Sequence, residues 1–371
     1  VNEEDINGAN LLMNYLDKQS GKPNELAILK ILIERGANVN HQKDDGESVL
    51  MVRLKDKEIF EYLISKNADL NLRNKDGNTL LHIAIEKKDK ELVKYLLEKN
   101  ANVNIQNFMG DTPLMQAIYF DEKEIINLLL EKNPDLNLKD SEGMTAIVHA
   151  IDKKQKDTVK LLISKNADLN AVDNKGYTPL MYAILSEEQE LIDLLLNSGS
   201  DVFAKSQRGY SVFMLACYKG NLNLVNLLLE KNVNIEEPSQ TYETALYNAI
   251  RNSKNRQHDI AQILLEKKIK TKRGKYRDYG VLSAAFYNDF KSMQYFIDQK
   301  FDLNIRDKDG NTPMMVAAER GYADIVNLLL TNKARAKKLN RKKESALTLA
   351  VKNNHWAVVQ ILNPAYKPPP K

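Results

Sequence analysis

The amino-acid sequence predicts an all-α fold, a curved and elongated solenoid in which helix-turn-helix units are joined by β-hairpin-like loops. Three observations predict it. A turn position, usually a glycine, returns every 33 residues from Gly77 to Tyr242. In the central copies, a short apolar helix pattern opens after a Thr-Pro or Thr-Ala pair, and a leucine-rich helix pattern follows. Stacked repeats also explain how 371 residues form a core, because a single compact core of that length would be unusual.

The segment from Asp307 to Ala334 shows the unit most clearly, as D-K-D-G-N-T-P-M-M-V-A-A-E-R-G-Y-A-D-I-V-N-L-L-L-T-N-K-A. Gly310 lies in a polar run suited to a tight turn. Thr312-Pro313 predicts a helix N-cap followed by a proline at the first helical position, where its missing N–H costs nothing. Gly321 predicts the end of this helix, since glycine readily adopts the left-handed conformation of a C-cap. The isoleucine, valine and leucine residues that follow recur at helical spacing and predict a second helix.

This unit resembles the ankyrin repeat, whose pattern is D-x-x-G-x-T-P-L-H-x-A-A, then a glycine and a helix that ends in Leu-Leu. The matching residues are Asp307, Gly310, Thr312, Pro313, Ala317, Ala318, Gly321, Leu328 and Leu329. The resemblance implies an ankyrin-repeat solenoid of about eleven repeats that binds protein partners. The turn positions of these repeats are Gly8, Gly46, Gly77, Gly110, Gly143, Gly176, Gly209, Tyr242, Arg277, Gly310 and Lys343.

We expect one repeat domain over residues 1–364, with a degenerate last repeat as its cap, and a proline-rich tail over residues 365–371. A solvated tail is favoured over a ligand for an SH3-like module. Three changes in repeat length are predicted to fall between the two helices of a unit, where they disturb no stacking face. They lie around Ser20–Pro23, near Lys55 and at Asn252–Gln257.

The array departs from the family pattern inside its repeats. The family histidine, which links neighbouring repeats by a hydrogen bond, is kept only at His82 and is elsewhere usually Met or Val, so packing is expected to replace that bond. The second alanine is often isoleucine, which is expected to change the spacing of the helices, at Ile85, Ile118, Ile151 and Ile184. An asparagine opens several hairpins, where its side chain is expected to bond local backbone, at Asn71, Asn104, Asn137 and Asn170.

Composition excludes several classes of protein. Hydrophobic residues are 43% and charged residues 28%, which are values of a folded domain, and no apolar run approaches the roughly 20 residues of a membrane span. The N-terminus carries no signal-peptide pattern. The chain begins with Val1 rather than Met, so the removal of an upstream targeting segment is kept as an alternative. A cytoplasmic location is favoured. Cys217 replaces the second alanine of the motif and is predicted to be a small buried hydrophobe.

The net charge of +4 hides an asymmetry along the chain. Residues 1–200 hold 25 Lys and Arg against 34 Asp and Glu, a net charge of −9. Residues 201–371 hold 29 against 16, a net charge of +13. We therefore expect the two parts of the chain to prefer different partners.

No catalytic, cofactor or metal motif is found. Phosphate-loop, dinucleotide, serine-hydrolase and zinc-protease patterns are absent, so the sequence predicts a protein that is not an enzyme. A remote alternative is an enzyme that uses carboxylates outside any motif. No zinc site and no cofactor are predicted, because the histidines fall in five different repeats without ligand spacing and there is no second cysteine. The histidines are His41, His82, His149, His258 and His355.

The predicted function is that of a non-catalytic, monomeric scaffold for a protein partner. In the proteins that this array resembles, partners bind on the concave side, next to the turn glycine and just after the Ala-Ala pair. Exposed aromatic side chains at such positions are typical of binding hot spots, although some could instead pack against a neighbouring repeat. The resemblance therefore implies a partner-binding set of Phe108, Met109, Tyr119, Phe120, Tyr177, Tyr210 and Tyr218. Further positions of the same kind are Leu185, Phe286, Tyr287, Glu142, Met144 and Asp152.

An alternative function is an adaptor for a polyanion, either nucleic acid or anionic lipid. Lys267–Arg277 and Lys333–Lys343 each hold seven Lys and Arg without an acidic residue. Both replace hairpin segments, and the simpler interpretation is solvated charge on loop tips. The residues predicted to bind the polyanion are Lys270, Lys272, Arg273, Lys275, Lys337, Lys338 and Arg341.

Overall fold

The computed structural model describes residues 2–18, 24–52, 54, 56–235, 237–241, 243–251, 258–267 and 277–367. These residues form 22 helices, which follow one another in pairs, as expected for about eleven repeats. Between the pairs, the described residues contain isolated β-bridges at the base of three loops and no longer strand. The predicted all-α repeat architecture is confirmed. The three predicted changes in repeat length, at 20–23, 55 and 252–257, lie outside the described residues.

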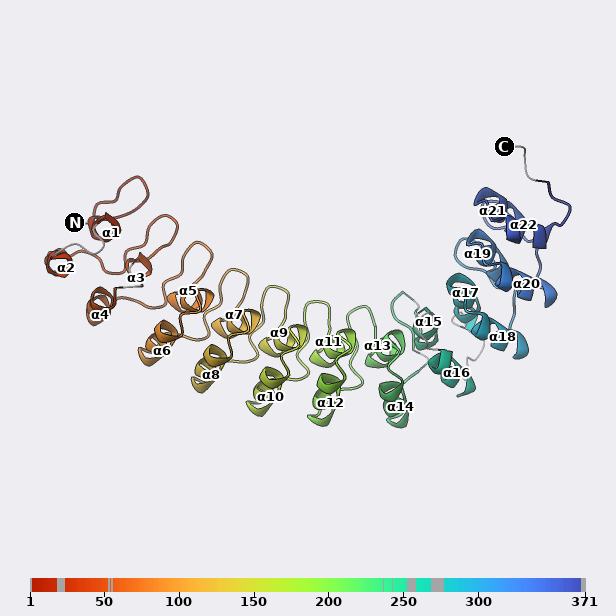
Figure 1. Cartoon of the computed structure of the whole chain (residues 1–371), viewed down its shortest axis with the longest axis horizontal. Coiled ribbons are helices and arrows are strands. Elements are labelled where there is room, and N and C mark those ends of the chain that lie inside the picture. Colours follow the sequence, from red (N-terminus) through yellow and green to blue (C-terminus); the bar gives the residue numbers. More distant parts are fainter. Residues whose placement is uncertain are drawn as a thin grey trace. The chain divides into compact units, whose positions relative to one another are not determined.

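The helices divide between two compact units, and each is described by itself. The first unit comprises Val1–Asn174 and Glu188–Ser200. In it, the first helices of successive repeats pack side by side, as do the second helices, and the hairpins extend from the side of the first helices (Figure 1). Its helices are α1 (Leu11–Lys18), α2 (Glu25–Glu34), α3 (Val49–Val52), α4 (Lys57–Ser65), α5 (Leu80–Glu86), α6 (Lys90–Glu98), α7 (Pro113–Tyr119), α8 (Lys123–Glu131), α9 (Ala146–Asp152), α10 (Lys156–Ser164) and α12 (Gln189–Asn197).

The second unit comprises Lys175–Glu187 and Asp201–Lys371 and has the same two layers of helices. Its helices are α11 (Pro179–Leu185), α13 (Val212–Lys219), α14 (Leu222–Glu230), α15 (Ala245–Arg251), α16 (His258–Glu266), α17 (Arg277–Tyr287), α18 (Phe290–Asp298), α19 (Pro313–Glu319), α20 (Ala323–Thr331), α21 (Ala346–Lys352) and α22 (Trp356–Leu362). No helix among the described residues of the chain is long and apolar enough to cross a membrane.

The predicted N-caps are present at the first helix of the regular repeats. The Thr112 hydroxyl accepts a hydrogen bond from the backbone N–H of Met115 at 3.2 Å, and Pro113 occupies the first turn of α7. Thr312 and Pro313 play the same parts at α19. Gly321 follows that helix with φ +76°, as predicted for its end. Each cap satisfies a backbone N–H that the first turn of a helix leaves without an intrahelical partner.

The core lies between the two helix layers and between successive repeats. In α7 and α8, Leu114, Ile118, Ile125 and Leu129 are all at most 1% exposed. Cys217 is fully buried in α13, as predicted, and burial raises the pKa of its thiol. A pair of helices this short exposes too much apolar surface to be stable alone, so each repeat depends on its neighbours.

Successive hairpins are joined by a backbone hydrogen bond that recurs along the chain. The N–H of Ser141 donates to the carbonyl of Met109 at 2.8 Å, and one repeat later the N–H of Asn174 donates to the carbonyl of Glu142 at 2.9 Å. The turn glycine allows the two hairpins to approach this closely. A Cβ added at Gly143 would lie 2.6 Å from the Asn174 nitrogen, and Gly143 also has φ +83°. The turn glycine therefore sets the distance between repeats.

The asparagine that opens a hairpin bonds the next repeat, which differs from the local bond expected from the sequence. Oδ1 of Asn71 accepts from the N–H of Asn102 at 2.9 Å, and Oδ1 of Asn104 accepts from the N–H of Asp135 at 2.9 Å. The local turn bond is instead made by the residue two positions earlier, since Oδ1 of Asp69 accepts from the N–H of Asn71 at 2.8 Å. Local sequence rules assign the asparagine side chain to a bond within its own turn. Stacking of the repeats brings a backbone N–H of the next repeat within its reach instead.

The family histidine makes the inter-repeat bond expected of it. Nε2 of His82 donates to the carbonyl oxygen of Asp111 at 3.1 Å, while Nδ1 lies 2.9 Å from the Thr79 hydroxyl. Burial lowers the pKa of His82 to about 4, so the ring is neutral near pH 7 and can accept at one nitrogen while it donates at the other. At the equivalent Met315, the sulfur accepts from the N–H of Thr312, within the same repeat, and no bond from it to another described repeat is seen. Methionine thus keeps the bond at the cap and loses the bond to the next repeat.

We predict that Leu195→Ala lowers the free energy of unfolding by about 2–5 kcal/mol, because Leu195 in α12 is fully buried and its truncation leaves a cavity. Asp193→Ala, on the exposed side of the same helix, is the control and should change stability by less than about 0.5 kcal/mol. Urea denaturation followed by circular dichroism measures both. An unchanged midpoint for Leu195→Ala would contradict the packing described.

We further predict that Gly143→Ala is more destabilising than Gly199→Ala. Both glycines have positive φ, +83° and +93°, so both alanines carry a backbone cost of about 1–2 kcal/mol. A Cβ at Gly199 meets nothing within 4 Å, whereas one at Gly143 pushes against the next hairpin, so Gly143→Ala should lose at least about 1 kcal/mol more. Equal losses for the two variants, measured in the same urea titration, would show that hairpin spacing does not depend on this approach.

Candidate functional site

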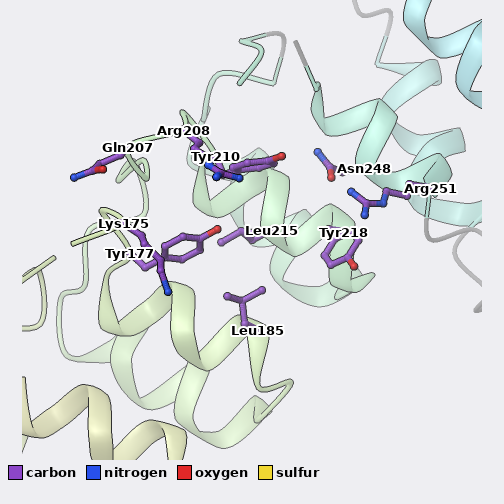
Figure 2. Close-up of a pocket in the computed structure, with 10 residues that line it drawn as sticks. All are labelled: Lys175, Tyr177, Leu185, Gln207, Arg208, Tyr210, Leu215, Tyr218, Asn248 and Arg251. Atoms are coloured by element: carbon purple, nitrogen blue, oxygen red, sulfur yellow. The ribbon is translucent and has the colours of Figure 1, made fainter. Parts of the chain in front are cut away.

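An open groove of about 550 Å³ lies on the second unit, across three successive repeats. We call it the tyrosine groove. Figure 2 shows Tyr177, Leu185, Leu215 and Tyr218 arranged around its opening, with Arg251 beside Tyr218. Its lining residues are Lys175, Tyr177, Leu185, Gln207, Arg208, Tyr210, Leu215, Tyr218, Asn248 and Arg251.

The lining residues come from equivalent places in consecutive repeats. Tyr177 and Tyr210 each stand one residue before the N-cap of a first helix, α11 and α13 respectively. Leu185 is the last residue of α11, and Tyr218 lies in the last turn of α13. Because the first helices pack side by side, side chains at these places form rows across the unit. The groove is the part of the unit where the rows carry tyrosine and leucine.

Hydrogen bonds and ring contacts hold the tyrosines in place. The Tyr210 hydroxyl donates to Oε2 of Glu243, in the next repeat, at 2.6 Å. Burial raises the pKa of Tyr210, and the bond to Glu243 raises it further, so the phenol stays protonated near neutral pH. The Tyr177 ring lies 6.0 Å from the Tyr182 ring, and the Arg251 guanidinium lies 5.2 Å from the centre of the Tyr218 ring. The three lining tyrosines are half-buried and present fixed surfaces to the groove.

The groove is cationic. Lys175, Arg208 and Arg251 line it, and none of the described lining residues is an acid. Within the described part of the chain, neither Arg208 nor Arg251 forms an ion pair. Arginine beside aromatic rings, in a partly desolvated groove, is suited to carboxylates or phosphates next to apolar side chains.

The structure brings together part of the partner-binding set predicted from the sequence. Tyr177, Tyr210 and Tyr218 line the tyrosine groove, together with Leu185. Sequence reasoning missed the three cations, because Lys175 and Arg208 lie in the hairpins beside the turn glycines and Arg251 ends a helix whose repeat departs from the motif. Lys175 and Arg208 each stand two residues before a predicted tyrosine, and this closeness in the sequence could have identified them as part of the same surface.

The other predicted partner-binding residues lie in the first unit. Phe108, Met109 and Tyr119 are 67%, 68% and 59% exposed, and Phe120 is partly exposed. Two of these rings have cationic neighbours. The Arg73 guanidinium is 4.8 Å from the Phe108 ring centre, and the Lys153 ammonium is 4.1 Å from that of Tyr119. These contacts cover part of each ring and leave the rest accessible.

Phe286 and Tyr287 belong to a neighbouring part of the second unit. Phe286 is 39% exposed and has the Arg320 guanidinium 3.4 Å from its ring centre. It lines an open pocket of about 620 Å³ together with Tyr247, whose hydroxyl is 3.1 Å from that of Tyr287. Burial raises the pKa of Tyr247. The aromatic row of the groove therefore continues toward α17.

Of the residues predicted to bind a polyanion, Lys270, Lys272, Arg273 and Lys275 lie outside the described residues. Lys337, Lys338 and Arg341 lie in the loop between α20 and α21. Lys338 Nζ is 3.5 Å from the carbonyl oxygen of Asn304, and the N–H of Arg341 joins the hairpin of the preceding repeat through the Asp309 carbonyl at 3.0 Å. None of these three lines the tyrosine groove.

Three possible metal ligands meet in the first unit. One ligand atom from each of Asp111, Asp140 and His149 lies within 4.8 Å of the others, and the Asp140 carboxylate is 2.8 Å from Nε2 of His149. Burial raises the pKa of the Asp111 carboxyl, the nearby His149 lowers it and the Asp140 carboxylate raises it. Sequence spacing did not reveal this group, because its members come from two repeats and follow no zinc-binding pattern.

Comparison with known proteins identifies the family of this chain. A family profile described as ankyrin repeats (3 copies) matches residues 18–107, 51–140, 114–206, 190–274 and 281–368. An ankyrin repeat and KH domain-containing protein of Caenorhabditis briggsae is 34% identical over 89 residues, which are 24% of this chain and 3% of that protein. A 60 kDa lysophospholipase of Mus musculus is 45% identical over 49 residues, 13% of this chain and 9% of that protein.

The chain thus spans less than a tenth of the length of either of these two relatives. Among solved structures, the ankyrin repeat domain of Bcl-3, a member of the IkappaB protein family, is 25% identical, with a TM-score of 0.49. That match covers 56% of this chain and 91% of the solved one.

Proposed function

Because the chain belongs to the ankyrin-repeat family, we propose that it is a non-catalytic scaffold that binds a partner protein in the tyrosine groove. Ankyrin repeats commonly mediate protein–protein interaction. The single observation that carries the proposal is the convergence of Tyr177, Tyr210 and Tyr218, predicted from two successive repeats, on one groove. A tyrosine row with adjacent arginine is the composition typical of binding hot spots.

The partner is proposed to present an acidic segment that also carries apolar or aromatic side chains. Leu185 and Leu215 offer apolar surface, and the three tyrosine rings offer flat surfaces for packing. Lys175, Arg208 and Arg251 supply positive charge along the groove, and no acid is among its lining residues. A carboxylate of the partner would form charge-assisted hydrogen bonds with a guanidinium.

The half-buried state of the tyrosines favours tight binding. Tyr210 is already oriented by its bond to Glu243, and Tyr218 by its contact with Arg251. Side chains that are ordered before binding lose less conformational entropy when the partner docks. Preorganisation of this kind is what distinguishes a binding groove from exposed aromatic residues on mobile loops.

We predict that peptides selected from a random library by the intact chain are acidic and bind in the groove. Tyr218→Ala should weaken the selected peptide by about 2 kcal/mol, roughly thirtyfold in Kd, because it removes the ring and the platform for Arg251. Arg251→Glu should weaken it at least as much by reversing the charge, and higher salt should weaken wild-type binding. Fluorescence anisotropy measures all three effects, and thermal melting checks that each variant is folded.

Phe108→Ala provides a matched control, since Phe108 is also an aromatic ring with an arginine beside it, but it lies in the first unit. It should leave the affinity for the peptide unchanged. Selection of neutral or basic peptides, or equal loss of affinity in Phe108→Ala and Tyr218→Ala, would refute the tyrosine groove as the binding site.

A further inference from the structure

The group formed by Asp111, Asp140 and His149 lies between two successive repeats of the first unit. Asp111 stands just before the N-cap of α7, whereas Asp140 lies in the next hairpin and His149 on α9. The side chain of Asp140 is 6% exposed and that of His149 is 16% exposed. One ligand atom from each residue lies within 4.8 Å of the other two. Two carboxylates and an imidazole therefore share a partly buried space.

The equivalent positions in other repeats show what is unusual here. Asn78 and Asn107 occupy the equivalent positions one repeat earlier, and there Nδ2 of Asn107 donates to Oδ1 of Asn78 at 3.2 Å. Far along the chain, Nδ2 of Asn340 donates to Oδ1 of Asn311 at 2.9 Å. Asp140 and Asp111 replace such an amide pair by two carboxylates, and ionised carboxylates can only accept. Two carboxylates cannot form the side-chain bond that joins the repeats at those two places, and two negative charges face each other instead.

The backbone around the group is held in place from several sides. Oδ1 of Asp140 accepts from the N–H groups of Glu142 and Met144, at 2.9 and 2.8 Å, so Oδ2 is the oxygen turned toward His149. The N–H of Asp111 donates to Oδ1 of Asn107 at 2.9 Å, and its carbonyl accepts from Nε2 of His82 at 3.1 Å. Such supporting bonds orient ligands before a metal ion arrives.

We propose that Asp111, Asp140 and His149 bind one divalent metal ion of the zinc class, which links two neighbouring repeats. Two carboxylates and one neutral imidazole balance the charge of a divalent cation. The imidazole favours Zn²⁺ over Ca²⁺ and Mg²⁺, which prefer oxygen ligands. On binding, the metal ion takes the place of the Nε2 proton that His149 shares with Asp140, and that proton is released to solvent.

The geometry fits this ion with a small adjustment. Zinc bonds to oxygen and nitrogen are about 2.0–2.2 Å long, so ligand atoms around one zinc ion lie roughly 3–4 Å apart. The 2.8 Å between Asp140 and His149 would open slightly, and the Asp111 carboxylate, within 4.8 Å, would rotate inward. Three protein ligands leave a fourth position for water or for a side chain of a partner. The ion would supply a side-chain link between the repeats, as the pairs Asn78–Asn107 and Asn311–Asn340 do in their places.

The test is calorimetric titration of the intact, chelator-treated chain with ZnCl₂ at pH 7.4, in parallel with CaCl₂ and MgCl₂. We expect one zinc ion per chain, with affinity at least about tenfold above that for calcium or magnesium. Replacement of zinc by Co²⁺ should give visible absorption bands that report ligand geometry, and bound zinc should raise the melting temperature.

The variants are taken from the residues found at equivalent positions, so each is compatible with the repeat. Asp111→Asn copies Asn78, Asp140→Asn copies Asn107, and His149→Gln copies Gln116. Each should weaken zinc binding at least about tenfold and abolish the zinc-dependent rise in melting temperature.

Asp307→Asn is the matched control, because Asp307 occupies the same hairpin position as Asp140, but in a repeat that carries Val316 where His149 stands. It should bind zinc as the wild type does. Absence of a stoichiometric zinc site, equal binding of calcium, or zinc binding that survives all three substitutions would overturn the proposal.

Discussion

The structure depends on the close approach of successive hairpins at the turn glycine. At Gly143 the next hairpin passes so near that an added Cβ would lie only 2.6 Å from its backbone nitrogen. A backbone N–H from that hairpin then reaches the preceding one, as Asn174 reaches Glu142 at 2.9 Å. The approach also brings the first helices of neighbouring repeats into contact, and their short apolar faces become buried. Spacing and core are therefore set by one backbone constraint.

Regular spacing turns equivalent positions into rows of side chains. The residue before each N-cap is the clearest row, and its members meet residues of the next repeat at hydrogen-bond distance. In this row, Asn78 bonds Asn107, Tyr210 bonds Glu243 and Asn311 bonds Asn340. The backbone frame is the same each time, so the chemistry of each location is decided by the side chains alone. Tyrosines in this row line the groove of the second unit, and Asp111 in the same row meets Asp140 and His149 in the first.

Much of the fold and part of the site followed from the sequence. The Thr-Pro caps, the leucine-rich second helices and the burial of Cys217 are local or periodic features, and local rules describe them well. Tyr177, Tyr210 and Tyr218 could be predicted because position within a repeat defines the face of a residue. The hairpin asparagines were assigned to local turns, whereas Asn71 bonds the following repeat, because the backbone of the neighbour offers an N–H that the local turn does not.

By itself, the sequence determined that this chain stacks helix pairs at a spacing of 33 residues and which residue types stand at each position of the repeat. Hydrophobic periodicity, caps and turn glycines act over a few residues, so they can be read without coordinates. Tertiary structure alone decided which side chains meet across repeats. It placed Arg251 against Tyr218 and joined Asp111 to Asp140 and His149. Such meetings depend on rotamers and on the distance between neighbouring backbones, which are set only when the repeats pack together.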